Sequence, residues 1–233
     1  MRGEADYKED GMRAGLQHEL DARRQQWQAG ATPERRALYE AQIEELRASG
    51  LVEQVLGVGS RAPGFSLPDA RGGSFALSDA LSRGPVVLVF YRGGWCPYCN
   101  IALKAYQRVL PEINALGAEL VAISPERPDL SLSTAEKNDL AFAVLSDTGN
   151  RVAGAFRLVY QLPTDLAQAY ATNGIDLTAI NAADEWCLPV PATFVIAATG
   201  RVTLAHIEVD YRRRLDPDAV LAALRFPETG LVA

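Results

Sequence analysis

The sequence of 233 residues is poor in cysteine and histidine and has no long apolar run. The three cysteines are too few for the disulfide framework of a secreted protein. No apolar run approaches the roughly 20 residues that a membrane-spanning helix needs. The polar, mixed-charge first residues lack the apolar core of a signal peptide. We therefore expect a cytoplasmic protein without a membrane partner.

The charge balance also argues against whole classes of partner. The formal net charge is −6, and no basic stripe favours nucleic acid. A structural zinc site would need two ligands beyond a cysteine pair, and Cys187, His18 and His206 are not paired at ligand spacing. The sequence shows no flavin, nicotinamide or haem motif, so we expect no metal and no bound cofactor.

The chain divides into a helical extension over residues 1–56 and an α/β domain over residues 57–233. Apolar positions over Leu16–Gln28 predict one helix, and a second begins at Pro33 with Thr32 as its N-cap. This helical hairpin is too small to bury its apolar faces alone. It is either a clasp packed on the domain or an arm for a dimer, and together with the acidic surface it favours a homodimer.

Strand and helix patterns alternate in the larger part. Alternating elements that end in an antiparallel hairpin imply a mixed sheet covered by helices, and hence an α/β fold. The sequence predicts strands over Pro85–Tyr91, Glu119–Ser124, Ala141–Leu145, Thr193–Ala197 and Arg201–Glu208, and helices over Pro97–Leu116 and Pro217–Arg225.

Two of the cysteines stand where a strand meets a helix. Cys96 and Cys99 directly follow the apolar strand Pro85–Tyr91 and open the next predicted helix. Thiols at this spacing can close a small disulfide ring, and a helix N-terminus favours a thiolate. Pro97, between them, suits the first position of a helix. The pattern therefore predicts thiol redox chemistry that ends in a Cys96–Cys99 disulfide.

These residues carry a family resemblance. The stretch 90–99 (FYRGGWCPYC) resembles the active-site loop of the thioredoxin-fold superfamily, and more narrowly that of the peroxiredoxin-like branch of the AhpC/TSA group. Further similar stretches are residues 58–67, 121–125, 144–147 and 188–196. The resemblance implies a thioredoxin-like fold with a mixed central sheet flanked by helices. It also implies a thiol-dependent peroxidase that reduces hydrogen peroxide or organic hydroperoxides. The oxidised protein is then reduced by a thioredoxin-like protein or a small thiol.

The resemblance leaves the attacking thiol open. Aligned with peroxiredoxins the attacking cysteine is Cys99, whereas aligned with thioredoxins it is Cys96. The substrate is open for the same reason: the alternative is a thiol–disulfide oxidoreductase acting on protein or small-molecule disulfides. A redox-regulated binding protein that works through the helical extension is a third hypothesis.

Supporting roles are expected for four further residues. Arg92 either stabilises a thiolate or oxyanion or is a solvent-facing loop charge. Trp95 either shapes the rim of the site or packs on the first helical turn. Pro191 stands where peroxiredoxins commonly carry an arginine, and its resemblance to the cis-proline of thioredoxins predicts a cis bond beside the dithiol. Thr193 either contacts the site or is an ordinary strand residue.

The remaining candidates lie near the end of the chain. We expect the run Arg212, Arg213 and Arg214 to form a solvated turn, although one of them could replace the missing arginine if the chain folds back. Cys187 is expected to be a small buried apolar residue, and a second resolving thiol is the alternative.

Overall fold

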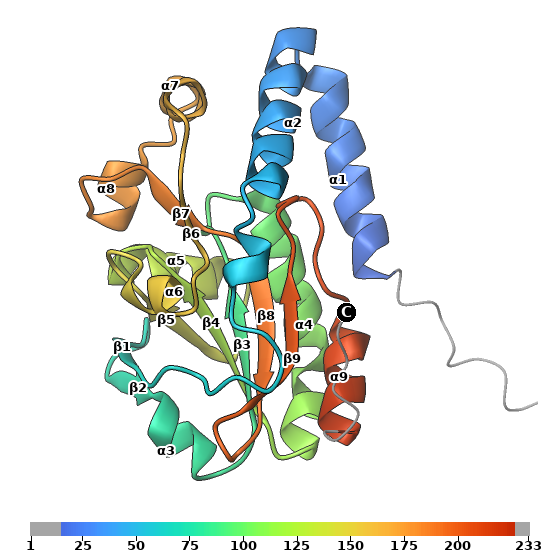
Figure 1. Cartoon of the computed structure of the whole chain (residues 1–233), viewed down its shortest axis with the longest axis vertical. Helices are drawn as coiled ribbons and strands as arrows, with labels where there is room; N and C mark the ends of the chain where they lie inside the picture. The colour runs from blue at the N-terminus through green and yellow to red at the C-terminus, as the bar shows by residue number, and fades with distance from the viewer. Residues whose placement is uncertain (1–14, 227–233) are drawn as a thin grey trace, which may run out of the picture.

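A mixed sheet of five strands forms the centre of the molecule (Figure 1). In the computed structural model, which describes residues 15–226, the strand order is β5-β4-β3-β8-β9. The β3–β4 and β4–β5 pairs are parallel, and the β3–β8 and β8–β9 pairs are antiparallel. The strands are β3 (Val86–Phe90), β4 (Glu119–Ser124), β5 (Ala143–Ser146), β8 (Ala192–Ile196) and β9 (Val202–Ile207). The predicted mixed α/β sheet is confirmed, with strand ends within two residues of the predictions.

Strand β3 is apolar throughout because both of its faces are covered. All of its residues are buried, and they alternate between two cores. Val87 and Val89 face the core beneath the long helix α4 (Pro97–Ala115), while Val86, Leu88 and Phe90 face the core on the opposite side. This central strand therefore delivers the loop that follows it to a fixed place at the end of the sheet.

Helices and short strands cover the two faces of the sheet. The α4 side also carries α5 (Pro128–Lys137) and α9 (Pro217–Arg225). The other side carries β1 (Ser66–Pro68), β2 (Ser74–Ala76), α3 (Leu77–Leu81) and α6 (Arg151–Ala155). The further elements are η1 (Val52–Gln54), α7 (Thr164–Thr172), α8 (Leu177–Asn181) and the antiparallel pair β6 (Val159–Gln161) and β7 (Cys187–Pro189).

The predicted extension is a helical hairpin that packs on its own domain (Figure 1). It consists of α1 (Leu16–Gly30) and α2 (Pro33–Ala48), and the Thr32 side chain caps α2 by accepting the Arg35 N–H at 3.3 Å. Leu16 and Leu20 are buried with the apolar residues of α4. The two-helix piece thus buries its apolar residues as a clasp within the chain, as one of the two interpretations predicted.

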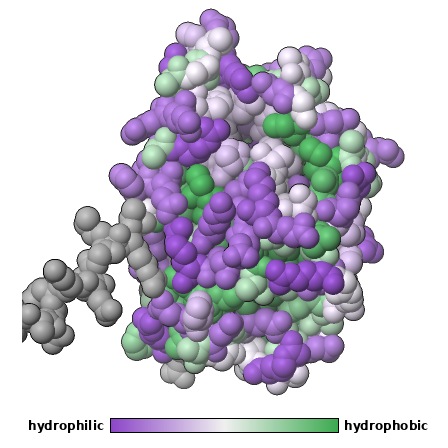
Figure 2. Space-filling model, turned by 180° about the vertical axis from the view of Figure 1, so that it is seen from behind, coloured by the Kyte–Doolittle hydropathy of each residue, from purple (hydrophilic) through white to green (hydrophobic). Residues whose placement is uncertain are grey.

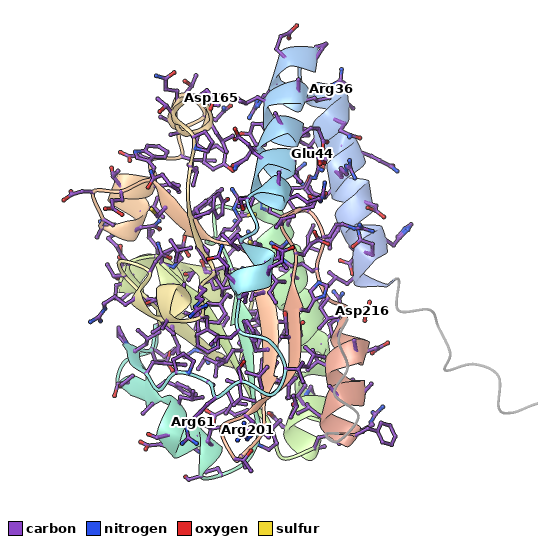
Figure 3. The ribbon with its side chains drawn as sticks, viewed as in Figure 1. Arg36, Glu44, Arg61, Asp165, Arg201 and Asp216 are labelled. Carbon is purple, nitrogen blue, oxygen red and sulfur yellow. The ribbon has the colours of Figure 1, made fainter. Side chains whose placement is uncertain are left out.

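One carboxylate links the clasp to the last helix. Asp216 caps α9 by accepting the Asp218 N–H at 3.0 Å, and it also accepts the Leu16 N–H at 3.3 Å where α1 begins (Figure 3).

The surface mixes polar and apolar residues. Figure 2 shows that hydrophilic side chains predominate on the face behind that of Figure 1, with smaller hydrophobic areas between them. No helix between residues 15 and 226 combines the length and the hydropathy needed to span a bilayer. The first residues of the chain, which underlie the expectation of a cytoplasmic protein, lie outside the described residues.

Candidate active site

Both thiols of the predicted pair lie at the N-terminus of α4. Cys96 is the N-cap residue and Pro97 is the first helical residue, as predicted, while Cys99 lies in the first turn and donates its N–H to the Cys96 carbonyl at 3.1 Å. The side chains are 1% and 0% exposed, and neither forms a disulfide in this structure. The two thiols are therefore separate in this structure, and both are protected from bulk water.

Two glycines shape the loop between β3 and the dithiol. Gly93 has φ of 142°, which a residue with a side chain rarely adopts. At Gly94 an added Cβ would lie 1.9 Å from the Thr134 hydroxyl, so α5 approaches the backbone more closely than any side chain allows. The loop can bring its thiols against the domain only because these two positions are glycine.

An arginine from the end of the chain reaches the second thiol. The Arg214 guanidinium donates to the Cys99 sulfur at 3.2 Å. The chain therefore folds back, as the alternative interpretation of the basic run required. The expectation of a solvated turn is wrong for Arg214 and for Arg212, which is 3% exposed, whereas Arg213 is exposed. The reason is that residues 208–216 form an irregular segment that passes over the dithiol before α9 begins.

The two thiols differ in acidity. Burial alone would raise the pKa of Cys99, but the hydrogen bond from Cys96 and the charges of Arg214 and Arg92 lower it below the ordinary value. Burial raises the pKa of Cys96 well above its ordinary value, and donating to Cys99 raises it further. The reduced pair therefore holds its negative charge on Cys99 and its proton on Cys96.

Arg92 lies inside an aromatic cage rather than in solvent. Its side chain is 1% exposed, and the guanidinium carbon lies 4.9 Å from the Trp95 ring centre, 5.6 Å from that of Tyr170 and 4.2 Å from that of Tyr211. It also donates a hydrogen bond to the Tyr170 hydroxyl. Cation–π contacts of this kind are stronger when water is excluded. The interpretation of Arg92 as a solvent-facing loop charge is thus wrong.

Trp95 is half-buried, and its ring meets Tyr170 edge-on at 5.5 Å. It therefore packs on the aromatic cage as well as on the loop. Tyr170 and Tyr211 could not be predicted as parts of the site, because their positions in α7 and in the irregular segment carry no local motif.

Pro191 lies directly before β8, and Thr193 is the second residue of that strand. Every peptide bond of residues 15–226 is trans, so the predicted cis bond before Pro191 is wrong. The chain is extended on both sides of that bond: Val190 donates its N–H to the Leu158 carbonyl at 2.8 Å, and Pro191 accepts the Glu208 N–H at 3.2 Å. The hydroxyls of Thr193 and Tyr106 lie 3.2 Å apart, which makes Thr193 a buried strand residue.

A buried carboxyl group beneath the loop was missed from the sequence. Glu126 is 3% exposed and accepts the Gly94 N–H at 2.9 Å and the Thr134 hydroxyl at 3.4 Å. Burial raises its pKa to about 7, and the negative charge of Cys99 acts in the same direction. An acidic residue just beyond the carboxyl end of a central parallel strand was the available signal, because such ends collect functional groups.

Cys187 lies apart from the dithiol in its contacts. Its side chain is half-buried on β7, and its thiol donates to the Gln161 side chain at 2.9 Å. The expectation of a fully buried apolar residue is therefore wrong, because the β6–β7 pair leaves this position at the surface. Among residues 15–226 no three His, Cys, Asp or Glu side chains converge as a ligand set for a metal.

The fold and the paired thiols at the start of α4 define a thioredoxin-like protein with a dithiol site. The chain belongs to the AhpC/TSA family, which matches residues 58–205. It is 32% identical over 130 residues to peroxiredoxin Q of Triticum aestivum, covering 56% of this chain and 58% of the relative. It is 34% identical over 108 residues to the thiol-disulfide oxidoreductase ResA of Geobacillus kaustophilus, covering 46% of this chain and 60% of the relative.

The chain thus spans less than two thirds of the length of these two relatives. Among solved structures, peroxidoxin BcpB from Mycobacterium tuberculosis is similar with a TM-score of 0.58 and 26% identity, covering 73% of this chain and 97% of that one. These similarities confirm the predicted family and the predicted thioredoxin-like fold.

Proposed function

We propose that the protein is a thiol-dependent peroxidase in which Cys99 attacks the peroxide and Cys96 resolves the product. The observation that carries this proposal is the contact of Arg214 with the Cys99 sulfur at 3.2 Å, beside the Cys96 thiol. A thiolate is the nucleophile in such reactions, and Cys99 is the thiol that its surroundings keep ionised. Similarity to peroxiredoxin Q and to peroxidoxin BcpB supports the same reaction.

The reaction with peroxide has two steps, an oxidation of Cys99 and a condensation that releases water. The Cys99 thiolate attacks one peroxide oxygen, so that an S–O bond forms, the O–O bond breaks and the leaving oxygen departs as alkoxide or hydroxide and takes up a proton. Cys99 is then a sulfenic acid. Cys96 next attacks that sulfur: the S–S bond forms, the S–O bond breaks, and the Cys96 proton leaves with the hydroxide as water. The guanidinium of Arg214 stabilises the developing negative charge in the first step.

The test is stopped-flow tryptophan fluorescence of the reduced protein with hydrogen peroxide and with cumene hydroperoxide. Trp95 adjoins the dithiol, so its emission should report oxidation. Cys99→Ser should abolish peroxide consumption, while Cys96→Ser should give a single turnover that stops at the sulfenic acid. Cys187→Ser is the matched control and should react as the unaltered protein does. Peroxide consumption that persists in Cys99→Ser and disappears in Cys96→Ser would reverse the two roles.

A thiol–disulfide oxidoreductase is the second candidate, favoured by the Cys-x-x-Cys spacing and by the similarity to ResA. The burial of both thiols favours a small oxidant over a protein disulfide in the first step. Rapid oxidation by a disulfide substrate, with peroxide reacting no faster than it does with a free thiol, would favour this second function.

The partners follow from the same proposal. A thioredoxin-like protein or a small thiol reduces the Cys96–Cys99 disulfide. The homodimer through the extension and the cytoplasmic location stay predictions, which sedimentation of the reduced protein and fractionation of cells would test. The redox-regulated binding protein also stays a hypothesis, and binding that survives the loss of both cysteines would support it.

A further inference from the structure

Within the irregular segment, residues 210–214 connect the dithiol to the helical extension. Tyr211 lies over Arg92 at 4.2 Å and meets the Tyr98 ring edge-on at 5.6 Å. Arg214 contacts Cys99 and also donates to the backbone carbonyls of Tyr211 and Arg213, which ties its guanidinium to the segment that carries it. Whatever holds this segment in place therefore also holds the positive charge beside the thiolate.

Arg212, in the middle of the segment, points to the extension instead. Its guanidinium donates to both carboxylate oxygens of Glu40 on α2, at 2.5 and 2.9 Å. It also donates to both oxygens of Asp210, at 2.7 and 2.8 Å. Arg212 is 3% exposed, so these charge-assisted bonds replace nearly all of its hydration. Glu40 is the one partner among them that belongs to another part of the chain.

We propose that Glu40 is a positioning residue for the dithiol, acting through Arg212 to hold Tyr211 on Arg92 and Arg214 on Cys99. The proposal rests on the proposed function only in taking Cys99 as the attacking thiolate. The helical extension then completes the active site from outside the part of the chain that matches the family.

Glu40 can fix the position of the segment because the buried guanidinium of Arg212 needs partners for its charge. The segment has no regular secondary structure, so its conformation depends on turns and on side-chain bonds such as those of Arg212. Without the Glu40 carboxylate the buried guanidinium would keep its two bonds to Asp210 but lose two charge-assisted bonds, and a buried charged group that loses a partner is destabilised until water replaces it. The segment would move to give Arg212 water, and Arg214, two residues further on, would move with it.

A movement of the segment changes the charges around Cys99, and hence its pKa. The groups that face Cys99 come from the loop, from the end of β3, from the segment after β4 and from the irregular segment: Cys96, Arg92, Tyr91, Glu126 and Arg214. Of these, Arg214 is the cation that the clasp controls. Its withdrawal leaves Arg92 as the remaining positive charge near the thiolate.

The test compares Glu40→Gln with Glu44→Gln in a Cys187→Ser background. Glu44 lies one turn further along α2, where it pairs with Arg47 at the surface (Figure 3). Thiolate absorbance at 240 nm against pH reports the first ionisation of the reduced pair, which belongs to Cys99. We expect Glu40→Gln to raise that pKa and to slow alkylation by iodoacetamide about tenfold at pH values below it, since one pH unit is a tenfold change in thiolate. Glu44→Gln should change neither quantity.

A lowered melting temperature in Glu40→Gln with an unchanged thiol pKa would overturn the proposal, because a merely structural clasp gives that result. Glu40→Asp keeps the charge but shortens the side chain by one methylene, so its thiol pKa should lie between those of the unaltered protein and Glu40→Gln. If Glu40→Gln does not fold, Glu40→Asp is compared with Glu44→Asp: a raised thiol pKa only in the first supports the proposal, and equal pKa values overturn it. These measurements need no peroxide, so a protein inactive toward peroxides would refute the proposed function without deciding this one.

Discussion

Removal of the guanidinium beside Cys99 tests the active site most directly. In Arg214→Gln the contact of 3.2 Å with the Cys99 sulfur is lost, while Arg92 and the Cys96 hydrogen bond remain. Two unit charges at that distance attract by about 5 kcal/mol at an effective dielectric constant of about 20, and entering water offsets much of this. Because a neighbouring opposite charge lowers a pKa by about 1–3 pH units, we expect the pKa of Cys99 to rise by about 1–2.

The direction of the pH effect follows from the thiol being an acid. A higher pKa means less thiolate at any pH below it, so the acid limb of the pH–rate profile should move to higher pH. On that limb each pH unit is a tenfold loss of rate. At a pH above both pKa values the thiolate is restored, and any remaining loss measures how much Arg214 stabilises the charge that develops on the leaving oxygen.

The assay is the second-order rate of reaction with hydrogen peroxide from about pH 4 to 9, followed by tryptophan fluorescence. Arg213→Gln is the matched control, because it removes an exposed neighbouring arginine of the same segment. The reasoning is refuted if Arg214→Gln and Arg213→Gln give the same profile as the unaltered protein.

The dithiol loop and the residues beneath it can be tested with three further variants. In Cys96→Ser we expect a sulfenic acid on Cys99 that dimedone traps, and a mass equal to that of the untreated protein would contradict this. Burial raises the pKa of Glu126 in the folded protein to about 7, so this carboxyl group destabilises the fold increasingly as the pH rises from its ordinary pKa toward 7. Between pH 5 and 8, the free energy of unfolding of Glu126→Gln in urea should therefore increase by up to about 3 kcal/mol relative to that of the unaltered protein. A constant difference across that range would show that Glu126 is not the group that titrates. Gly94→Ala places a Cβ against Thr134 and should lower the free energy of unfolding by about 1–3 kcal/mol. The control Gly154→Ala has open space at that position in α6 and should not be destabilised.

The sequence predicted the sheet and the place of the dithiol because both depend on local patterns. The apolar strand before Cys96 and the proline after it mark a strand–helix junction that needs no knowledge of the rest of the chain. The contact of Arg214 with Cys99 joins residues 115 positions apart, and no periodicity records such a contact. Glu126 was missed for a related reason: it became significant only when β4 paired beside β3 and brought it under Gly94.

The cis bond at Pro191 was predicted from the resemblance to the cis-proline of thioredoxins, and the structure has a trans bond there instead. Hydrogen bonds on both sides of the proline fix an extended path from β7 into β8. In the same way, Arg212 was expected in solvent because arginine usually is, but its carboxylate partner lies on a helix of the extension. The usual exposure of arginine describes an average residue. Arg212 and Arg214 are instead held by partners that are far away in the sequence, Glu40 and Cys99.

The two helical segments on either side of the family-matching region meet over α4. Leu16 at the start of α1 and Asp218 at the start of α9 donate their N–H groups to the same carboxylate, that of Asp216. A shortened protein that lacks α1 would therefore expose apolar residues of α4 to water. It would also lose the hydrogen bond from the Leu16 N–H to Asp216, the residue that caps α9. Helices α1 and α9 lie outside the region that matches the family, yet together they cover the outer face of α4. In a shortened domain without them, that face of α4 would need polar residues in place of its apolar ones.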